Sequence, residues 1–429
     1  MDDRHLKVEL YGQKVGTLVP RADGGARFTP DPPWVEREFV PRLGLGWDLR
    51  RGSGTRSSSM GLPAWFENLL PERGSLVRER IARQVGISET SSFALLQALG
   101  HVLPGAVIVG PDTDNRGLDS TPPDSDKQDP PQGDPAASEE SRLSSLGGMQ
   151  LKFSVSIRND KVVWPLKGQD GDWLIKLATG NYPQLAEVEF ATMAWARAVG
   201  FDVPKNKLAR VVDQEAFAHL ASTDEENAFL IQRYDRSSSG RIHQEDFAQV
   251  LEVMPEDKYG ERARVPINHN GMARIVLDAC GEAELTKYIE RLVFVIVSGN
   301  TDAHFKNWSL LHPYGGRPIL TPVYDQVCTI SWPSLGWEPS KKPPKLALGI
   351  GKTRSLVEVD VSNFYPLARR VRQAEAWVEK LVLETVERCI AAWTFVEQFA
   401  PPRMRRALQA HFTRVPLLCR FASPVSKDA

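Results

Sequence analysis

The chain has 429 residues, 41% of them hydrophobic and 25% charged, which is ordinary for globular proteins and long enough for two or three packed domains. The formal net charge at pH 7 is −1, so no overall positive field exists to hold nucleic acid, and direct DNA or RNA binding is disfavoured as the main activity. The four cysteines form no CxxC pair, which argues against a zinc site or a disulfide framework and favours a reducing compartment.

The N-terminus and the apolar runs indicate a protein without a membrane segment. The first residues lack the charged and then apolar pattern of a signal peptide, because acidic side chains interrupt it early. The most apolar run, Leu292–Ser298, is far too short to cross a bilayer. We therefore expect a soluble, cytoplasmic protein with no membrane partner.

The first quarter of the chain, residues 1–109, is expected to form a small α+β domain. Residues 6–18 alternate apolar and polar side chains around Tyr11-Gly12, which predicts a hairpin. Residues 61–86 change to helical apolar spacing and end at a glycine. The following segment, 110–143, is rich in Pro, Asp, Ser and Gly and is predicted to be a disordered linker.

The rest of the chain is expected to form two lobes, 144–236 rich in strands and 237–429 mainly helical. The predicted strands are Leu151–Ile157, Val162–Leu166 and Trp173–Leu177, and the predicted helices are Leu185–Val199, Asp246–Leu251, Met272–Cys280, Glu282–Val297 and a series through 365–411. This order of elements predicts an α+β, bilobal fold with a nucleotide cleft at the seam between the lobes.

The most informative motif follows the apolar helix that ends at Val297. It reads Gly-Asn-Thr-Asp302-Ala-His-Phe-Lys-Asn307, and its Asp and Asn have the spacing of the kinase catalytic loop, H-R-D-x-x-x-x-N. At that spacing Asp302 can serve as the base for an incoming hydroxyl while Asn307 turns back to Mg²⁺. Such a pair also arises by chance about once in a protein of this length, so by itself it is a weak signal.

A second metal ligand is expected in the segment that follows Asn307. Leu320–Asp325 reads as an apolar strand that ends in a carboxylate, which is where a second Mg²⁺-binding Asp belongs. A single Asp at a strand end is more often a turn residue. The order of the two motifs along the chain favours the metal role.

Upstream residues are candidates for binding the phosphates of a nucleotide. The glycines of Ser144-Ser-Leu-Gly-Gly-Met-Gln-Leu-Lys152 would let backbone N–H groups approach phosphates, although a Gly-Gly hairpin is the more common meaning. Lys176 lies on an apolar strand and, if it faces inward, needs an anionic partner, for which Glu189 on the next helix is the candidate. Strand alternation equally allows Lys176 to face solvent.

Eight motifs, in the same order along the chain, resemble the HipA family of bacterial kinases. They are LPAWFENLLPE (62–72), LLQALGHVLPGAVIV (95–109), SLGGMQLK (145–152), LIKL (174–177), QRYDR (232–236), RIHQEDF (241–247), GNTDAHFKN (299–307) and PVYD (322–325). The resemblance covers almost the whole chain. It implies a kinase-like fold with an additional N-terminal domain.

By this resemblance Asp302 is the catalytic base, and Asn307 and Asp325 hold Mg²⁺. It also implies ATP contacts from a phosphate loop, a strand lysine, the hinge that meets adenine, and the catalytic loop. These ATP-binding residues are Gly147, Gly148, Met149, Gln150, Lys152, Lys176, Gln232, Arg233, Tyr234, His304 and Lys306. Ser145 falls on the position that the family autophosphorylates to switch the kinase off, and the long insertion leaves the register between Ser144 and Ser145 open.

The resemblance further implies a Ser/Thr protein kinase that is the toxin of a toxin–antitoxin module. Such kinases phosphorylate a host protein, glutamyl-tRNA synthetase in the best-known type, and their partner is a small helix-turn-helix antitoxin, HipB-like, through which DNA is bound indirectly. Two alternatives remain: a catalytically inactive HipA-like pseudokinase that binds an antitoxin, and a HipA-like kinase outside toxin–antitoxin biology. Joint retention of Lys176, Asp302, Asn307 and Asp325 argues against the first, because binding alone needs no base.

Overall fold

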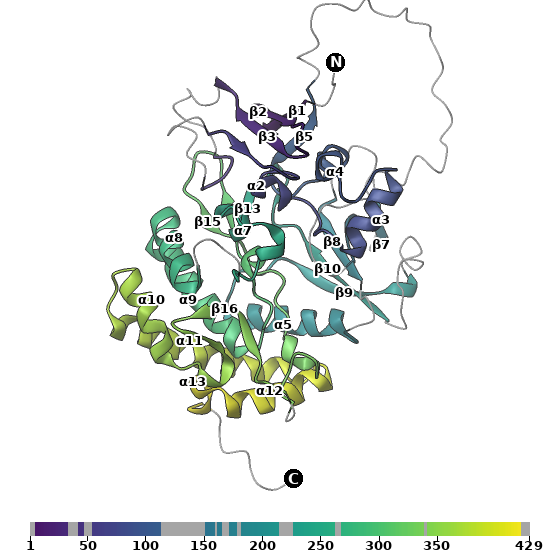
Figure 1. Cartoon of the computed structure of the whole chain (residues 1–429). Helices are drawn as coiled ribbons and strands as arrows, with labels where there is room; N and C mark the ends of the chain where they lie inside the picture. Colours follow the sequence, from purple (N-terminus) through teal and green to yellow (C-terminus); the bar gives the residue numbers. More distant parts are fainter. Residues whose placement is uncertain are drawn as a thin grey trace, which may run out of the picture.

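The computed structural model of the protein describes residues 5–32, 42–46, 54–112, 151–158, 161–164, 171–177, 182–213, 226–261, 267–338 and 341–421. The predicted linker lies outside the described residues from 113 onward, and so does the glycine-rich segment 144–150. In Figure 1 the N-terminal sheet, in purple, lies at one end of the molecule and the C-terminal helices, in yellow-green, at the other, with teal strands between them.

The N-terminal residues form an antiparallel sheet with strand order β4-β3-β2-β1-β5. Its strands are β1 (Leu6–Leu10), β2 (Gln13–Pro20), β3 (Ala26–Pro30), β4 (Arg56–Ser57) and β5 (Val107–Pro111). The predicted hairpin is confirmed, since β1 pairs with β2 across Tyr11 and Gly12. Both turn residues have positive φ, 53° and 71°, which suits the right-handed twist of the two strands.

Three short helices pack into the same core as this sheet: α2 (Ala64–Glu67), α3 (Leu76–Gln84) and α4 (Ser92–Leu99). The single helical stretch predicted over 61–86 is therefore divided. Pro71 has no N–H to donate, and Gly74 adopts a φ of 72°, so the chain turns between α2 and α3. The stop at Gly86 is confirmed, because α3 has ended before it and its φ is 69°.

A second antiparallel sheet has the order β7-β6-β8-β10-β9. Its strands are β6 (Leu151–Arg158), β7 (Lys161–Val163), β8 (Trp173–Leu177), β9 (Asn206–Arg210) and β10 (Asn227–Gln232). Helix α5 (Leu185–Val199) packs against β9 and β10 and has the predicted bounds. It ends at Gly200, whose φ of 104° an L side chain rarely adopts.

The C-terminal half is mainly helical, as predicted. Its helices are α7 (Phe247–Val250), α8 (His269–Cys280), α9 (Glu282–Val297), α10 (Tyr365–Arg370), α11 (Glu375–Val396), α12 (Pro402–Arg414) and α13 (Pro416–Cys419). Its strands are β11 (Arg236–Ser237), β12 (Gly240–Arg241), β13 (His243–Asp246), β14 (Ser309–His312), β15 (Ile319–Leu320), β16 (Lys345–Ile350) and β17 (Thr353–Ser355). The apolar helix α9 lies at the centre, in contact with α8 and α11, and none of the described helices is long and apolar enough to span a bilayer.

The strand predicted over Leu320–Asp325 is shorter than expected. Regular pairing covers only Ile319–Leu320 in β15, and Asp325 has a φ of 49°, which ends any extended conformation. Pro322 contributes to this difference because it has no N–H for the ladder. Asp325 is thus held by an irregular segment that follows β15.

The second sheet is buried on both faces, and each face belongs to a different core. Ala228 and Leu230 of β10 belong to the core of the N-terminal sheet, whereas Phe229 and Ile231 belong to the core built around α5 and α9. This division follows from the alternation of side chains along a strand. The second sheet is therefore sandwiched between the N-terminal residues and the helical half.

Candidate active site

A cavity of about 910 Å³ lies where the second sheet, the helical half and the N-terminal residues meet. Its wall combines side chains from β6, β8 and β10, from the loops after α9 and β15, and from the loop between α2 and α3. Ten of the predicted site residues line it: Lys152, Lys176, Gln232, Arg233, Tyr234, Asp302, His304, Lys306, Asn307 and Asp325. Ser145, Gly147, Gly148, Met149 and Gln150 lie outside the described residues.

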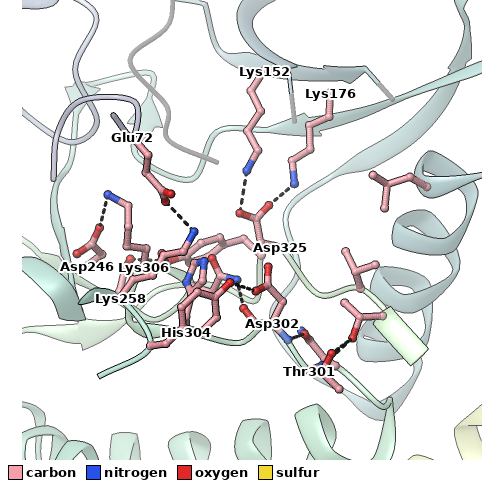
Figure 2. Close-up of a pocket in the computed structure, with 18 of the residues that line it drawn as sticks. Glu72, Lys152, Lys176, Asp246, Lys258, Thr301, Asp302, His304, Lys306 and Asp325 are labelled. Carbon is pink, nitrogen blue, oxygen red and sulfur yellow. Dashed lines mark hydrogen bonds and ion pairs between the residues drawn. The ribbon is translucent and has the colours of Figure 1, made fainter. Parts of the chain in front are cut away.

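Two lysines converge on Asp325 at one side of the cavity, as Figure 2 shows. Lys152 on β6 is paired directly opposite Lys176 on β8, so both side chains project from the same face of the sheet. The Lys152 ammonium lies 3.0 Å from Asp325 Oδ2, and the Lys176 ammonium donates to Asp325 Oδ1. Lys176 is 4% exposed, which excludes the alternative in which it faces solvent.

Lys176 also forms the expected ion pair with Glu189 of α5. Glu189 is fully buried, so this carboxylate depends on the lysine for its stability in the interior. Burial alone would lower the pKa of Lys176, but the carboxylates of Asp325 and Glu189 outweigh it and raise the pKa. Burial by itself would raise the pKa of Asp325. The positive charges of Lys152 and Lys176 outweigh the effect of burial, so the pKa of Asp325 is lowered. Burial also raises the pKa of Glu189, and the charge of Lys176 opposes this effect.

The loop after α9 fixes Asp302 through its neighbours. The Asp302 backbone N–H donates to Asn300 Oδ1 at 2.9 Å, and Asn307 Nδ2 donates to the Asp302 carbonyl oxygen at 2.8 Å. The hydroxyl of Tyr259 donates to Asp302 Oδ1 at 2.7 Å. Burial raises the pKa of Asp302, and the hydrogen bond from Tyr259 opposes this effect. The result is a partly desolvated carboxylate at the cavity wall, as a general base requires.

His304 immediately precedes the short 3-10 helix Phe305–Asn307, and Lys306 lies within it. Burial lowers the pKa of His304 well below its ordinary value, and its Nδ1 atom has no hydrogen-bond partner among the described residues. Lys306 lines the cavity, but its ammonium donates to the carbonyl oxygen and to Oδ1 of Asn68, at 2.9 and 3.1 Å. Lys306 is therefore held by the N-terminal residues at the cavity wall, and its contact with phosphates stays a prediction.

The predicted hinge, Gln232–Tyr234, forms another part of the wall. The backbone N–H of Arg233 donates to the backbone carbonyl oxygen of Asp172 at 2.8 Å, and its buried guanidinium pairs with the Asp235 carboxylate at 2.9 and 2.8 Å. The side chain of Arg233 therefore points to Asp235, and this ion pair holds the backbone in place just after β10. The ring of Tyr234 lies 5.3 Å from that of Tyr324.

The oxygen atoms near Asp302 fit Mg²⁺. Asp325 offers a carboxylate, and Asn307 has its amide N–H engaged with Asp302, so its Oδ1 is the atom that can bind a cation. In the described part of the chain, no group of three or more His, Cys, Asp or Glu side chains could hold a metal ion. Two oxygen ligands completed by substrate phosphates and water are a usual arrangement for Mg²⁺.

Sequence reasoning missed several residues of the cavity wall, among them Asn68, Glu72, Lys258 and Tyr259. Lys258 forms an ion pair with Glu72 at 2.8 Å, and Tyr259 donates to Asp302. Asn68 and Glu72 lie inside the motif LPAWFENLLPE, which had served only to support the family resemblance. Lys258-Tyr259 carries no local signal of its own.

Comparison with known proteins assigns the family. A family model described as the HipA N-terminal domain matches residues 6–110, and one described as the HipA-like C-terminal domain matches residues 144–393. A protein of Sinorhizobium fredii named "Putative kinase Y4dM" is 35% identical over 431 residues, which cover 97% of this chain and 98% of the relative. The serine/threonine-protein kinase toxin HipA of Shewanella oneidensis is 24% identical over 365 residues, covering 76% and 78%.

A solved structure supports the same fold. The Shewanella oneidensis toxin–antitoxin complex of HipA, HipB and operator DNA contains a chain that matches with a TM-score of 0.70 and 19% identity, covering 96% of this chain and 97% of that one. The α+β, kinase-like fold with an additional N-terminal domain is thereby confirmed. With both family models matched and a 35% identical relative aligned over nearly its full length, this chain belongs to the HipA family.

Proposed function

We propose that this protein is an ATP-dependent, Mg²⁺-requiring protein kinase that phosphorylates serine or threonine hydroxyls. The observation that carries the proposal is the convergence of Lys176, Asp302, Asn307 and Asp325 around one cavity, with the buried Glu189 paired to Lys176. These are the residue types that phosphoryl transfer needs: a lysine held by a glutamate, two oxygen ligands for metal, and a base. The kinase names of the relatives support the same reaction class.

In the proposed reaction, Asp302 accepts the proton of the substrate hydroxyl as its oxygen attacks the γ-phosphorus of ATP. The new O–P bond forms while the bond from the γ-phosphorus to the β–γ bridging oxygen breaks, and ADP leaves. Lys152 and Lys176 offer positive charge to the phosphates from the sheet above. When bound at Asp325 and Asn307, Mg²⁺ would neutralise phosphate charge.

The buried ion pairs have a second role in this proposal. Asp325 and Lys176 are held together by an ion pair, and the fully buried Glu189 holds the lysine from its other side. Preorganised charges act on a transition state without reorientation, which is where much of enzymatic rate enhancement arises. The site residues therefore favour catalysis over simple nucleotide binding, which needs no base at Asp302.

The test is phosphoryl transfer from labelled ATP with Mg²⁺, comparing wild type with Asp302→Ala. We expect transfer to the protein itself or to a lysate protein by wild type, and a loss of roughly 10²–10⁴-fold in the variant with nucleotide binding retained. Asp278→Ala, an exposed residue paired with Arg274 on α8, is the matched control. Absence of any transfer by wild type that binds ATP would support the pseudokinase alternative.

We further propose that the kinase acts as the toxin of a toxin–antitoxin module. Support comes from the Shewanella relative, named as a toxin, and from the solved complex that contains HipB and operator DNA. A small helix-turn-helix antitoxin would then be the partner, with DNA bound through it and a cytoplasmic host protein as substrate. Co-expression with the neighbouring reading frame, followed by affinity purification, should recover a stoichiometric complex. A kinase that is active but has no such partner would belong outside toxin–antitoxin biology.

The same assay tests autophosphorylation. We propose that the modified serine is Ser145, in the phosphate loop. Mass spectrometry of wild-type protein after incubation should place the phosphate there, and phosphate confined to Ser144 would correct the register.

A further inference from the structure

The N-terminal unit, the part of the chain before residue 113, contributes side chains to the cavity wall. These side chains also hold the loop that carries Asp302. The side chain of Glu72 pairs with Lys258 at 2.8 Å, and Asn68 accepts two hydrogen bonds from Lys306. Lys306 immediately precedes Asn307, and Lys258 immediately precedes Tyr259. Two lysines of the helical half are thus attached to one five-residue segment, Asn68–Glu72, and Figure 2 shows the Glu72–Lys258 contact.

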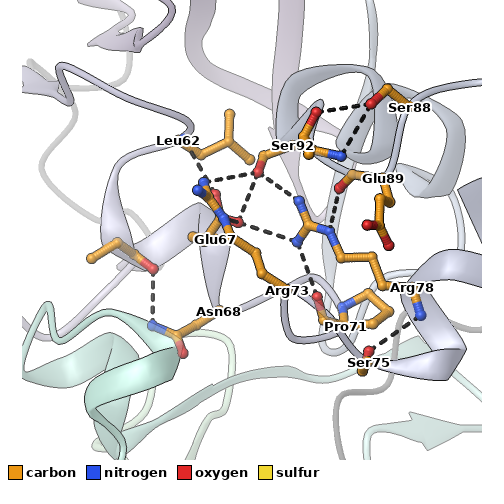
Figure 3. Close-up of polar contacts among 12 residues, drawn as sticks. Leu62, Glu67, Asn68, Pro71, Arg73, Ser75, Arg78, Ser88, Glu89 and Ser92 are labelled. Atoms are coloured by element: carbon orange, nitrogen blue, oxygen red, sulfur yellow. Dashed lines mark hydrogen bonds and ion pairs between the residues drawn. The ribbon is translucent and has the colours of Figure 1, made fainter.

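This segment is itself rigidly supported, as Figure 3 shows. The buried guanidinium of Arg78 donates to Glu67 Oε1 at 3.2 Å and to the Pro71 carbonyl oxygen at 3.0 Å. Arg73 donates to the same Glu67 oxygen at 3.0 Å, and Ser92 does so at 2.8 Å. Because buried charged groups are costly to separate from their partners, Glu72 is presented from a fixed backbone.

Tyr259 connects this support to Asp302. Its hydroxyl donates to Asp302 Oδ1, its ring lies edge-on to that of His304 with centroids 5.3 Å apart, and its carbonyl oxygen accepts from Arg354 at 2.8 Å. The Lys258 ammonium lies 5.4 Å from the centre of the same ring. The tyrosine is therefore fixed at its backbone, its ring and its hydroxyl.

We propose that Tyr259 is a positioning residue for Asp302, and that Glu72 and Asn68 hold Tyr259 and the catalytic loop in place from the N-terminal unit. This inference rests on the proposed kinase function and deepens it. By binding Oδ1, the tyrosine hydroxyl fixes the rotation of the carboxylate and leaves Oδ2 to accept the proton of the substrate. The N-terminal unit would then be a part of the catalytic centre.

The expected effect is on turnover and not on nucleotide affinity. A base displaced by as little as 1 Å loses roughly 10²-fold in rate. Among the described residues, Tyr259 forms no hydrogen bond with Lys152, Lys176 or Asp325, the groups proposed to meet the phosphates and metal. Tyr259→Phe keeps the ring and its contacts with His304 and Lys258 but removes the hydroxyl. We expect kcat to fall by about 10- to 100-fold with the KM for ATP within about twofold of wild type.

Tyr365→Phe is the matched control. Its hydroxyl donates to Glu379 at 2.7 Å, the same kind of bond at the same length, but far from the cavity on α10. It should leave both kinetic constants unchanged. Wild-type kcat in Tyr259→Phe, or a change confined to the KM for ATP, would overturn the inference.

The contribution of the N-terminal unit is tested by Glu72→Gln, with Glu79→Gln as its control, since Glu79 makes an exposed pair with Arg83 on α3. We expect kcat to fall about 3- to 10-fold in Glu72→Gln and not in Glu79→Gln. Because Glu72 acts through Tyr259, the double variant with Tyr259→Phe should lose little more than Tyr259→Phe alone. Losses that multiply would show that Glu72 acts independently, against the proposal.

Hydrogen–deuterium exchange of the full chain separates this inference from the kinase function itself. Peptides that cover 300–307 should exchange faster in Tyr259→Phe and in Glu72→Gln than in wild type or in the two controls. This result would support the positioning role even if no substrate accepted phosphate. Unchanged exchange in both variants, together with an active wild type, would overturn the inference while leaving the kinase proposal intact.

Discussion

The fully buried carboxylate of Glu189 is the residue on which the nucleotide side of the cavity depends. It has Lys176 as its ion-pair partner, and Lys176 in turn holds Asp325. Lys152 differs, because its ammonium lies 3.0 Å from Asp325 and, among the residues that the structure describes, it forms no ion pair with Glu189. Two lysines that face each other on paired strands therefore have unequal structural roles.

This inequality predicts unequal losses of stability. Lys176→Met would leave Glu189 without its cation in the interior and should lower the free energy of unfolding by about 3–5 kcal/mol. Lys152→Met leaves Asp325 paired with Lys176 and should cost about 1 kcal/mol. Urea unfolding followed by tryptophan fluorescence measures both, and equal losses in the two variants would contradict the assignment. Adding Glu189→Gln to Lys176→Met should recover part of the loss.

At the scale of elements, a buried histidine links helix α12 to α9 by a hydrogen bond. His411 Nε2 lies 2.7 Å from the Ile296 carbonyl oxygen and donates to it, while the indole N–H of Trp337 donates to Nδ1 at 3.2 Å. Both ring nitrogens are used by the neutral form, with the proton on Nε2. Burial lowers the pKa of His411 to about 4.

The lowered pKa predicts a loss of stability on acidification. Between the unfolded value of about 6.5 and the folded value, the unfolded chain binds a proton at His411 that the folded chain does not, so unfolding becomes easier as pH falls. From pH 7.5 to pH 5.5 this group should contribute a loss of about 1.4 kcal/mol.

Urea unfolding at the two pH values measures this loss. The free energy of unfolding of His411→Gln should change less between the two pH values, by that amount. His101→Gln, at an exposed histidine, is the control and should keep the wild-type pH dependence. Burial lowers the pKa values of His243 and His269 to about 3, so these two residues also reduce the free energy of unfolding as the pH falls. Their contribution is the same in both variants and does not affect the comparison. A His411→Gln protein with the wild-type pH dependence would refute the assignment.

At the scale of the whole molecule, the N-terminal unit is joined to the rest by apolar packing as well as by polar contacts. One face of the second sheet, with Val155, Ile175, Leu177 and Leu230, belongs to the same buried cluster as the N-terminal sheet. The other face packs on α5 and the helical half. The N-terminal unit therefore covers a sheet face that would otherwise be a large exposed apolar patch.

Removal of the N-terminal unit should accordingly prevent the remainder from existing as a soluble monomer. We expect a fragment of residues 144–429 to aggregate or to be insoluble, because it exposes this face. Co-expression with residues 1–112 should restore a soluble complex. Size-exclusion chromatography measures both outcomes, and a monodisperse, folded 144–429 fragment would show that the face is covered in another way.

The sequence by itself determined the elements whose signals are local. Helix α5 has the predicted bounds because apolar spacing near 3.6 residues and the stop at Gly200 lie within one segment. The Asp302–Asn307 spacing was also readable, since six consecutive residues carry it. The strand predicted to end at Asp325 was too long, because the apolar residues around Pro322 suggested a strand that the proline, without an N–H for the ladder, interrupts.

Only the tertiary structure decided which distant groups meet. Asp325 is 173 residues from Lys152 and 149 from Lys176, and Lys306 reaches Asn68 across 238 residues. No periodicity or spacing contains such contacts, because they arise when three packed units bring their surfaces together. The roles proposed for Tyr259 and Glu72 were invisible in the sequence for the same reason: each depends on a neighbour supplied by the packing of the whole molecule.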